Sequence, residues 1–154
     1  MTIQIDSREK AKAIKKIIAT FDKRGVKWFV SKLPVGDYMS FDNPRLIIDR
    51  KQNLSELCGN VCQQHKRFRA ELERANEYGI KLVVLCEHGK NITCLSDVMQ
   101  WVNPRLKKSP MAVSGERLYK ILSAMSQKYS VDFLFCTKAH TGKRIIELLE
   151  AGNE

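Results

Sequence analysis

The sequence lacks any apolar run near the roughly 18–20 residues that a membrane-spanning helix needs. It also begins without the basic and then apolar segments of a secretory signal peptide, since an acid already stands at Asp6. Internal repeats, low-complexity segments and linker-like stretches are missing as well. These absences predict a single domain over residues 1–154 that is intracellular and does not enter a membrane.

A structural zinc site is also poorly supported. The chain has five cysteines, an odd number, and none of them forms a CxxC pair. Cys58 and Cys62 lie four residues apart with His65 close behind, but a zinc site needs a fourth ligand and usually tighter spacing. Cys86 and Cys136 fall in apolar runs typical of buried strands. We interpret the cysteines as small core residues in a reducing compartment.

Positive charge is abundant instead. Lys and Arg number 27 against 17 Asp and Glu, which gives a formal net charge of +10. Such an excess on a small domain favours a polyanionic partner such as nucleic acid, although charge alone is equally consistent with a generally basic surface. Trp101, beside the basic loop at 105–108, is the one aromatic residue that we consider as a wedge between DNA bases.

The apolar pattern predicts the element order β-α-β-β-β-α-β-α-α-β-α. We predict strands at 3–6, 26–33, 37–41, 45–50, 80–86 and 131–136. Predicted helices follow Ser7, span 54–78 and 95–102, include 118–125 and end the chain at 141–150. Ser7 is predicted to cap the first helix and Gly25 to end it. Strands alternating with helices at this length predict an α/β domain with helices on both faces of the sheet.

Charged residues at strand ends are the candidates for chemistry. Asp6 closes the first strand, Asp37 follows a glycine turn, and Asp49 and Lys51 close a later strand on the same side. Two carboxylates within reach of one point would suit Mg²⁺ or Mn²⁺, and a nearby lysine could neutralise developing charge. A bare D-x-K spacing is more often a surface ion pair, with Asp37 capping a turn.

Three short motifs in order make the nuclease interpretation more specific. They are IDSRE at 5–9, GDY at 36–38 and IDRK at 48–51. Together they resemble the D-x-R-E, GDY and ERK elements of the XPF-type structure-specific endonucleases (the ERCC4 domain family), a branch of the PD-(D/E)xK restriction-endonuclease-like superfamily. The resemblance covers about the first 90 residues clearly. It implies a restriction-endonuclease-like fold with a mixed central sheet flanked by helices on both faces.

The resemblance also implies roles for individual residues. Asp37 and Asp49 would be the ligands of Mg²⁺ or Mn²⁺, and Lys51 the catalytic lysine. Asp6 would be a supporting acid near the metal. The other implied residues are Glu9 and Arg8, which would line the site, and Arg50, which would support the site or contact phosphate.

Two departures from the family pattern bear on these roles. The signature acid is Asp49 rather than Glu, so the metal geometry would shift slightly. The family places an Asp four residues after the lysine, where this chain has Ser55 and then Glu56. Either Ser55 caps the helix and Glu56 takes over the acidic role, or that role is missing. We favour Glu56.

Basic residues beyond the motifs are candidates for DNA contact. The predicted helix carries Lys66, Arg67 and Arg69, of which Arg67 also falls where the family often has an arginine. The alternative is a solvated helix whose basic residues pair with Glu71 and Glu73. The loop with Arg105, Lys107 and Lys108 could clamp the DNA backbone, or it could be an ordinary mobile loop.

The resulting hypothesis is a metal-dependent endodeoxyribonuclease. The resemblance suggests that it cuts branched, flap or junction DNA, with roles in DNA repair or recombination. The alternative is a non-catalytic DNA-binding module that keeps the nuclease fold. We expect no helix-hairpin-helix domain, because the sequence ends at Glu154, so DNA would be found by this domain, by a homodimer or through a partner DNA-binding protein. The small format suggests the cytoplasm of a bacterium or of a phage-infected host.

Overall fold

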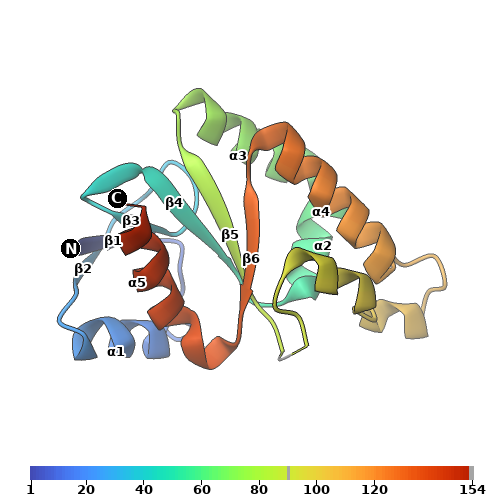
Figure 1. The fold of residues 1–154 in the computed structure, drawn as a ribbon, viewed down its shortest axis with the longest axis horizontal. Coiled ribbons are helices and arrows are strands. Elements are labelled where there is room, and N and C mark those ends of the chain that lie inside the picture. Colours follow the sequence, from blue (N-terminus) through green and yellow to red (C-terminus); the bar gives the residue numbers. More distant parts are fainter. Residues whose placement is uncertain (90, 153–154) are drawn as a thin grey trace.

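A six-stranded sheet with strand order β2-β1-β3-β4-β5-β6 forms the middle of the molecule (Figure 1). The structure, a computed structural model, describes residues 1–89 and 91–152. The strands are β1 (Thr2–Ile5), β2 (Lys27–Val30), β3 (Tyr38–Ser40), β4 (Asn43–Lys51), β5 (Lys81–Glu87) and β6 (Asp132–Cys136). The α-helices are α1 (Lys15–Lys23), α2 (Leu54–Cys62), α3 (His65–Glu77), α4 (Gly115–Tyr129) and α5 (Thr141–Ala151), and short 3₁₀ helices are η1 (Leu95–Gln100), η2 (Pro104–Lys107) and η3 (Lys138–His140).

The sheet is mixed, as the motifs predict. Strand β1 is parallel to β2, and β4, β5 and β6 are parallel to one another. Strand β3 is antiparallel to both of its neighbours, β1 and β4. Five strands therefore run in one direction and end at the same edge, which we call the carboxyl edge. Strand β3 begins at that edge, so residues preceding β3 meet residues that end the other strands.

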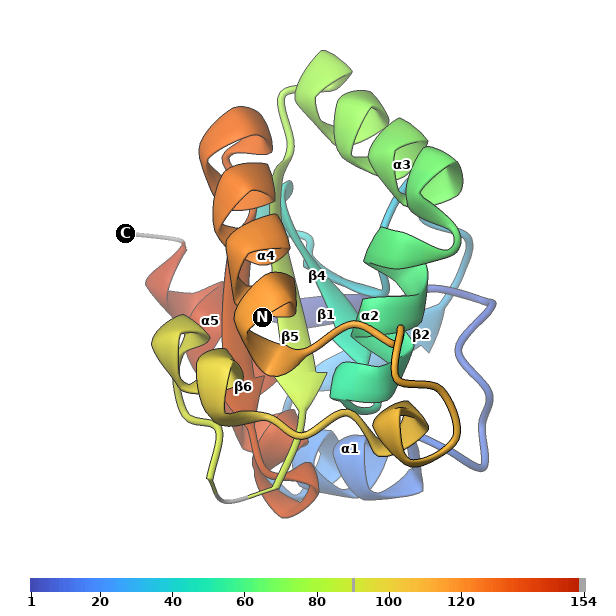
Figure 2. The same cartoon turned by 90° about the vertical axis from the view of Figure 1, so that its right-hand side faces the viewer.

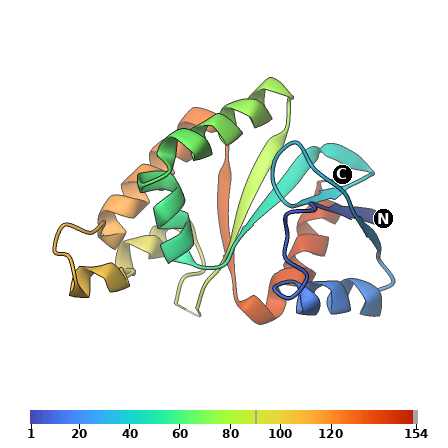
Figure 3. The same cartoon turned by 180° about the vertical axis from the view of Figure 1, so that it is seen from behind.

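Helices cover both faces of the sheet, which confirms the predicted fold class. Helices α1 and α5 pack together on one face, whereas α2, α3 and α4 lie on the other (Figures 1 and 2). The view from behind shows the same division (Figure 3). Each face has its own apolar core, because successive strand residues point to opposite sides. Ile47 belongs to the core under α2 and α3, and Ile48 to the core under α1 and α5. Among the described residues, no helix has the length and apolar character needed to cross a bilayer.

Two predicted helix boundaries are wrong. The helix predicted over 54–78 is broken, because the amides of Gln63 and Gln64 both donate to the carbonyl of Gly59, at 2.9 and 3.0 Å, and α3 starts anew at His65. The first helix is not capped by Ser7: residues 7–14 form turns, and α1 begins at Lys15 without a side-chain cap. The segment predicted as a helix at 95–102 forms the 3₁₀ helix η1.

Gly36 is required by the backbone just before β3. Its φ is +67°, a left-handed conformation that side chains with a Cβ rarely adopt. A Cβ at this position would also lie 2.5 Å from Cγ2 of Ile47 and 3.2 Å from the carbonyl oxygen of Ile48. The glycine therefore lets the chain approach β4 closely enough for Asp37 to join the sheet edge.

Candidate active site

Asp37 is fixed against the end of β4 by two hydrogen bonds. Its backbone amide donates to the carbonyl of Ile48 at 2.8 Å, and its Oδ2 accepts from the amide of Arg50 at 2.7 Å. Asp37 lies in the bend just before β3, next to the pair formed by Tyr38 and Ile48. These two bonds therefore hold its carboxyl group beside β4 at the carboxyl edge.

Asp49 and Lys51 lie next to Asp37 on the face covered by α2 and α3. Both side chains are largely buried, and Lys51 Nζ lies 3.2 Å from Asp49 Oδ2. The ammonium also stands 5.5 Å from the ring centre of Phe68 on α3. Within the described part of the chain, Asp49 Oδ2 is buried and makes no hydrogen bond. The structure thus brings together the three residues that the motifs predict as the centre of the site.

Acidic side chains outnumber basic ones around Asp37 and Asp49. Although Asp37 keeps some solvent exposure, burial raises its pKa well above the usual value, and the charges of Asp49 and Glu9 raise it further. Burial alone would lower the pKa of Lys51, but the charges of Asp49 and Glu71 outweigh it and leave this pKa raised. The raised pKa keeps Lys51 a cation, and the raised pKa of Asp37 marks a carboxyl group that gains from a proton or another positive charge nearby.

Glu71 on α3 is a further acid at the site that sequence reasoning missed. It is partly buried, and its Oε1 accepts a hydrogen bond from the amide of Gly36 at 3.2 Å. Burial raises its pKa, and the charge of Asp49 adds to the effect. A signal was available in the sequence: Glu71 stands between Phe68 and Leu72 on the helix face that points inward, where an apolar residue is the normal choice.

Arg50 points to the opposite face of β4, as the two-residue period of a strand requires. Its guanidinium binds Glu9 through Nε at 2.8 Å and also pairs with Glu87 at the end of β5. Glu9 accepts a further bond from Tyr38 Oη at 2.6 Å, and Glu87 one from Thr141 Oγ1 at 2.7 Å. This buried network, from Tyr38 to Thr141, joins β3, β4, β5 and α5. The side chains of Glu9 and Arg50 are thus engaged in this network on the α1 and α5 face, although the charge of Glu9 still reaches Asp37.

Asp6 has little capacity left for a metal. Its Oδ2 accepts from both the amide and Nε of Arg8, at 3.1 and 2.6 Å, and its Oδ1 accepts from the amide of Leu33 at 2.7 Å. Burial alone would raise its pKa, but these hydrogen bonds outweigh it and lower the pKa. Asp6 holds the turns after β1 and β2 in place. Arg8, by contrast, has a largely exposed side chain.

The acid expected shortly after Lys51 has a different place in the structure. Asn53, not Ser55, caps α2: its side chain accepts from the amide of Glu56 at 2.8 Å. Glu56 reaches back to the amide of Gln52, also at 2.8 Å, so the two side chains form a reciprocal helix cap. The alternative in which Ser55 is the cap is therefore wrong. Glu56 is exposed, and its carboxylate is engaged in this cap at the start of α2.

Of the candidate DNA contacts, Arg67 is the one that the structure brings to the site. It lines a pocket of about 200 Å³ together with Lys51 and Glu71. Lys66 and Arg69 are exposed on α3 outside this pocket, and Arg69 lies 4.0 Å from Glu73. The helix therefore combines one residue facing the site with others that face solvent.

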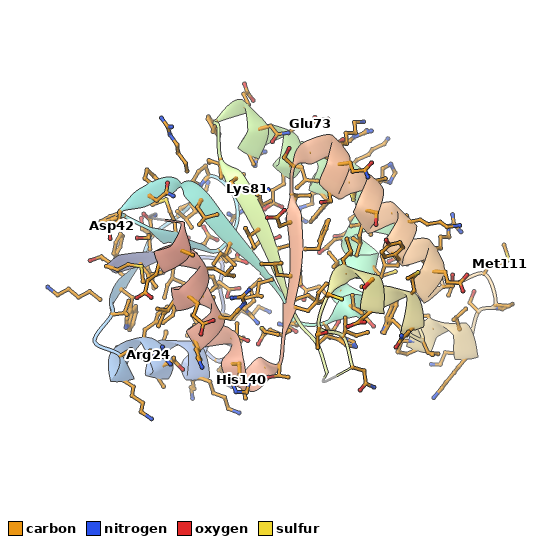
Figure 4. The ribbon with its side chains drawn as sticks, in the orientation of Figure 1. Arg24, Asp42, Glu73, Lys81, Met111 and His140 are labelled. Carbon is orange, nitrogen blue, oxygen red and sulfur yellow. The ribbon has the colours of Figure 1, made fainter. Side chains whose placement is uncertain are left out.

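The basic loop lies against α2, on the side of the molecule away from α1. Asn103 anchors it by accepting from the amide of Arg105 at 3.0 Å and donating to the carbonyl of Val113 at 2.9 Å. Arg105 lines a pocket of about 330 Å³ there, and Met111 projects at the outer end of the loop (Figure 4). Lys107 and Lys108 are exposed. Trp101 is 9% exposed and packs in the core, so the wedge interpretation is wrong.

The residues present fit a divalent cation at the carboxylate pair. Asp49 Oδ2 is buried and, within the described residues, makes no hydrogen bond beside its ion pair with Lys51 at 3.2 Å. The neighbouring charge raises the pKa of Asp37, although burial has the larger effect. Mg²⁺ is commonly bound through one or two carboxylates, with water completing its ligands. No group of three or more His, Cys, Asp or Glu side chains able to hold a metal occurs across residues 1–89 and 91–152. A metal would therefore rely on the pair.

A mixed sheet with two carboxylates and a lysine at neighbouring strand ends is the arrangement that the resemblance to the restriction-endonuclease-like superfamily implies. The family model of the ERCC4 domain matches residues 5–149. The chain therefore belongs to the ERCC4 domain family, which confirms the recognition made from the IDSRE, GDY and IDRK motifs.

Comparison with solved structures supports the same fold. The chain is similar to XPF from Aeropyrum pernix, with a TM-score of 0.69 and 16% identity over 100% of this chain and 66% of that chain. A structure of XPF from Aeropyrum pernix in complex with DNA matches with a TM-score of 0.69 and 17% identity, over 98% of this chain and 64% of that one. The chain thus spans just under two thirds of those XPF chains. No curated protein matches it.

Proposed function

We propose that this chain is a divalent-metal-dependent endonuclease that hydrolyses phosphodiester bonds in branched, flap or junction DNA. The observation that carries the proposal is the pairing of Asp37 with Asp49 beside Lys51 at the end of β4. Membership of the ERCC4 domain family and similarity to an XPF that was solved with DNA support DNA as the substrate. The net charge of +10 supports a polyanionic substrate of this kind.

In this proposal Asp37 and Asp49 would hold Mg²⁺ or Mn²⁺. When bound, such an ion polarises the phosphodiester and makes a water molecule more acidic. Lys51 acts as a cation, because its raised pKa keeps the ammonium protonated. It is placed to orient the attacking water and to neutralise the charge that develops on the phosphate. Lys51 is therefore an electrostatic group in this proposal and not a proton acceptor.

Glu71 and Arg67 complete the proposed site from α3. Burial raises the pKa of Glu71, as does the charge of Asp49, so this acid exchanges its proton nearer to neutral pH than an ordinary glutamate. Arg67 lines the same pocket and presents a guanidinium suited to a phosphate next to the one being cut. The helix then supplies one group for proton exchange and one for substrate position.

Partners follow from the same proposal. We propose that the chain holds its DNA as a homodimer or together with a partner DNA-binding protein, as the membership of the ERCC4 domain family suggests. Light scattering of the complex with a four-way junction gives the number of copies bound.

The experiment that tests the function is cleavage of flap, fork and four-way-junction DNA with Mg²⁺ or Mn²⁺. Wild type should cut, whereas Asp49→Ala should lose cleavage and keep DNA binding, because one carboxylate of the pair is gone. Asp42→Ala is the matched control, since Asp42 is exposed in the β3–β4 turn. Salt-sensitive binding without metal-dependent cutting by wild type would replace the proposal with a non-catalytic DNA-binding module.

A further inference from the structure

A second basic hollow lies on the face of the sheet opposite the carboxylate pair. It has a volume of about 330 Å³ and lies between the start of α1 and η3. Four lysines line it: Lys12, Lys15, Lys16 and Lys138. All four are exposed, and the sequence places three of them within five residues. Such a concentration of like charge is unfavourable until an anion neutralises it.

Among the described residues, these lysines have no counter-charge. None of the four forms an ion pair with a described residue, whereas Lys81 pairs with Asp132 at 3.1 Å elsewhere. Glu87 does line the hollow, but it is buried and engaged by Arg50 and Thr141. The hollow therefore presents unneutralised ammonium groups to the solvent.

The hollow continues toward the candidate active site. Ala13 lines both this hollow and a neighbouring one of about 160 Å³ that includes Arg8 and Lys10. Two acids, Glu9 and Glu56, also line the second hollow, but Arg50 binds Glu9 and the amide of Gln52 binds Glu56. The pKa of Arg8 is raised, first by its hydrogen bond to Asp6 and then, against the effect of burial, by the charges of Asp6, Asp37 and Glu71. Arg8 thus stands within electrostatic reach of both the hollow and the carboxylate pair.

All of these groups lie at the carboxyl edge of the sheet. Lys138 follows β6, the turns with Lys10 and Lys12 follow β1, and Lys51 ends β4. Figure 4 shows His140, the last residue of η3, at this edge, and Lys81 at the opposite end of β5. A positively charged path therefore runs across the carboxyl edge from the α1 face to the carboxylate pair.

We propose that this path, formed by Lys12, Lys16 and Lys138 and continued by Lys10 and Arg8, binds the DNA backbone on one side of the bond that is cut. The proposal rests on the nuclease function above. Two adjoining open hollows fit a chain of phosphates better than a single small anion. Flexible lysines act as point charges without base contacts, so the path fixes the position of the DNA and carries no sequence preference. Arg67 lies on the other side of the site.

The test is the salt dependence of DNA binding, measured by fluorescence anisotropy in EDTA on flap and junction DNA. Each phosphate contact to duplex DNA contributes about 0.9 to the slope of log K against log salt. The triple variant K12A/K16A/K138A should therefore lower this slope by roughly 2.7. Between 50 and 200 mM salt, the loss of affinity should then shrink by roughly fortyfold relative to wild type. The matched control K23A/K27A/K120A removes the same charge from exposed lysines outside both hollows and should change the slope by less than about 1.

A second measurement locates the contact. Shortening the DNA arms one at a time should weaken wild-type binding when the arm on the path is removed, and K12A/K16A/K138A should no longer respond to that arm. Equal effects of the two triple variants, or an unchanged response to arm length, would overturn the path. Metal-dependent cleavage by wild type and its loss in Asp49→Ala report on the nuclease function separately, so the path can fail while the function stands.

Discussion

The two faces of β4 differ in how completely their charged side chains are paired. On the α2 and α3 face, two carboxylates share one cation: Asp49 Oδ2 lies 3.2 Å from Lys51 and makes no hydrogen bond among the described residues, and burial and this neighbour raise the pKa of Asp37. On the α1 and α5 face, Arg50 is surrounded by Glu9 and Glu87, and every one of these groups is paired. Asp49 and Arg50 are adjacent in sequence but have different roles. The incomplete face suits an incoming cation, and the complete face holds the strands that present it.

The largest effect is expected from removing the positive charge of the network on the α1 and α5 face. Arg50→Met should lower the free energy of unfolding by about 3–5 kcal/mol, because it leaves Glu9 and Glu87 buried without a counter-charge. Urea denaturation measures the change. Arg45→Met is the control, since Arg45 is exposed on the same strand and should change stability by less than about 0.5 kcal/mol. Similar small losses in both variants would show that the network contributes little.

Removing the cation of the incomplete face should affect catalysis instead. Lys51→Ala should reduce cleavage by about 10²–10³-fold, the usual effect of losing one electrostatic group that stabilises the transition state. DNA binding should stay within about threefold, because Lys51 is largely buried and paired with Asp49. Single-turnover cleavage and anisotropy measure the two quantities. A parallel collapse of binding would make Lys51 a phosphate contact only.

Without metal, the burial of Asp37 close to Asp49 should lower the stability of the folded protein. A carboxyl group whose folded pKa is raised contributes its full stability below the usual Asp pKa of about 3.9 and loses it as the pH rises through the raised value. In EDTA, Asp37→Asn should therefore gain stability over wild type as the pH rises toward 8, by about 1.4 kcal/mol for each unit of pKa shift.

Thermal unfolding at several pH values tests this expectation. Added Mn²⁺ should stabilise wild type and leave Asp37→Asn nearly unchanged. Asp42→Asn serves as the exposed control and should show no pH-dependent difference. A wild-type stability that rises with pH relative to Asp37→Asn would contradict the raised pKa.

The smallest effect concerns Glu56, which we assign to the helix cap. Glu56→Ala should cost about 1 kcal/mol of stability, because the bond to the amide of Gln52 is lost. Cleavage measured well below the melting temperature should change by less than about threefold. Glu73→Ala on the exposed surface of α3 is the comparison. A loss of cleavage comparable to that of Lys51→Ala would return Glu56 to the active site.

Much of this arrangement could be read from the sequence, because strand period and motif order are local properties. The period of two placed Asp49 and Lys51 on one face, and the GDY motif placed Asp37 on the neighbouring strand. The break between α2 and α3 could not be predicted from the apolar pattern, for a physical reason. Val61 and Phe68 are both core residues seven positions apart, so the apolar pattern continues in phase through the break.

Other roles depend on contacts between distant segments. Glu9 and Glu87 lie 78 positions apart, and only the folded sheet brings both to Arg50. Asp6 similarly finds Leu33 across the β1–β2 pair. A resemblance can indicate that such acids matter, but it does not tell which of them face the site and which support it from behind.

The reversed direction of β3 has a practical consequence for engineering. Because β3 starts at the carboxyl edge, its connection to β4 around Asp42 lies at the far edge of the sheet, away from Asp37 and Lys51. Asp42 is exposed at this turn, and Figure 4 shows it well apart from His140. Surface turns of this kind tolerate inserted sequence. A fluorescent label, an affinity tag or an additional DNA-targeting module could be introduced after Asp42 while the strand register that sets the carboxylate pair is preserved.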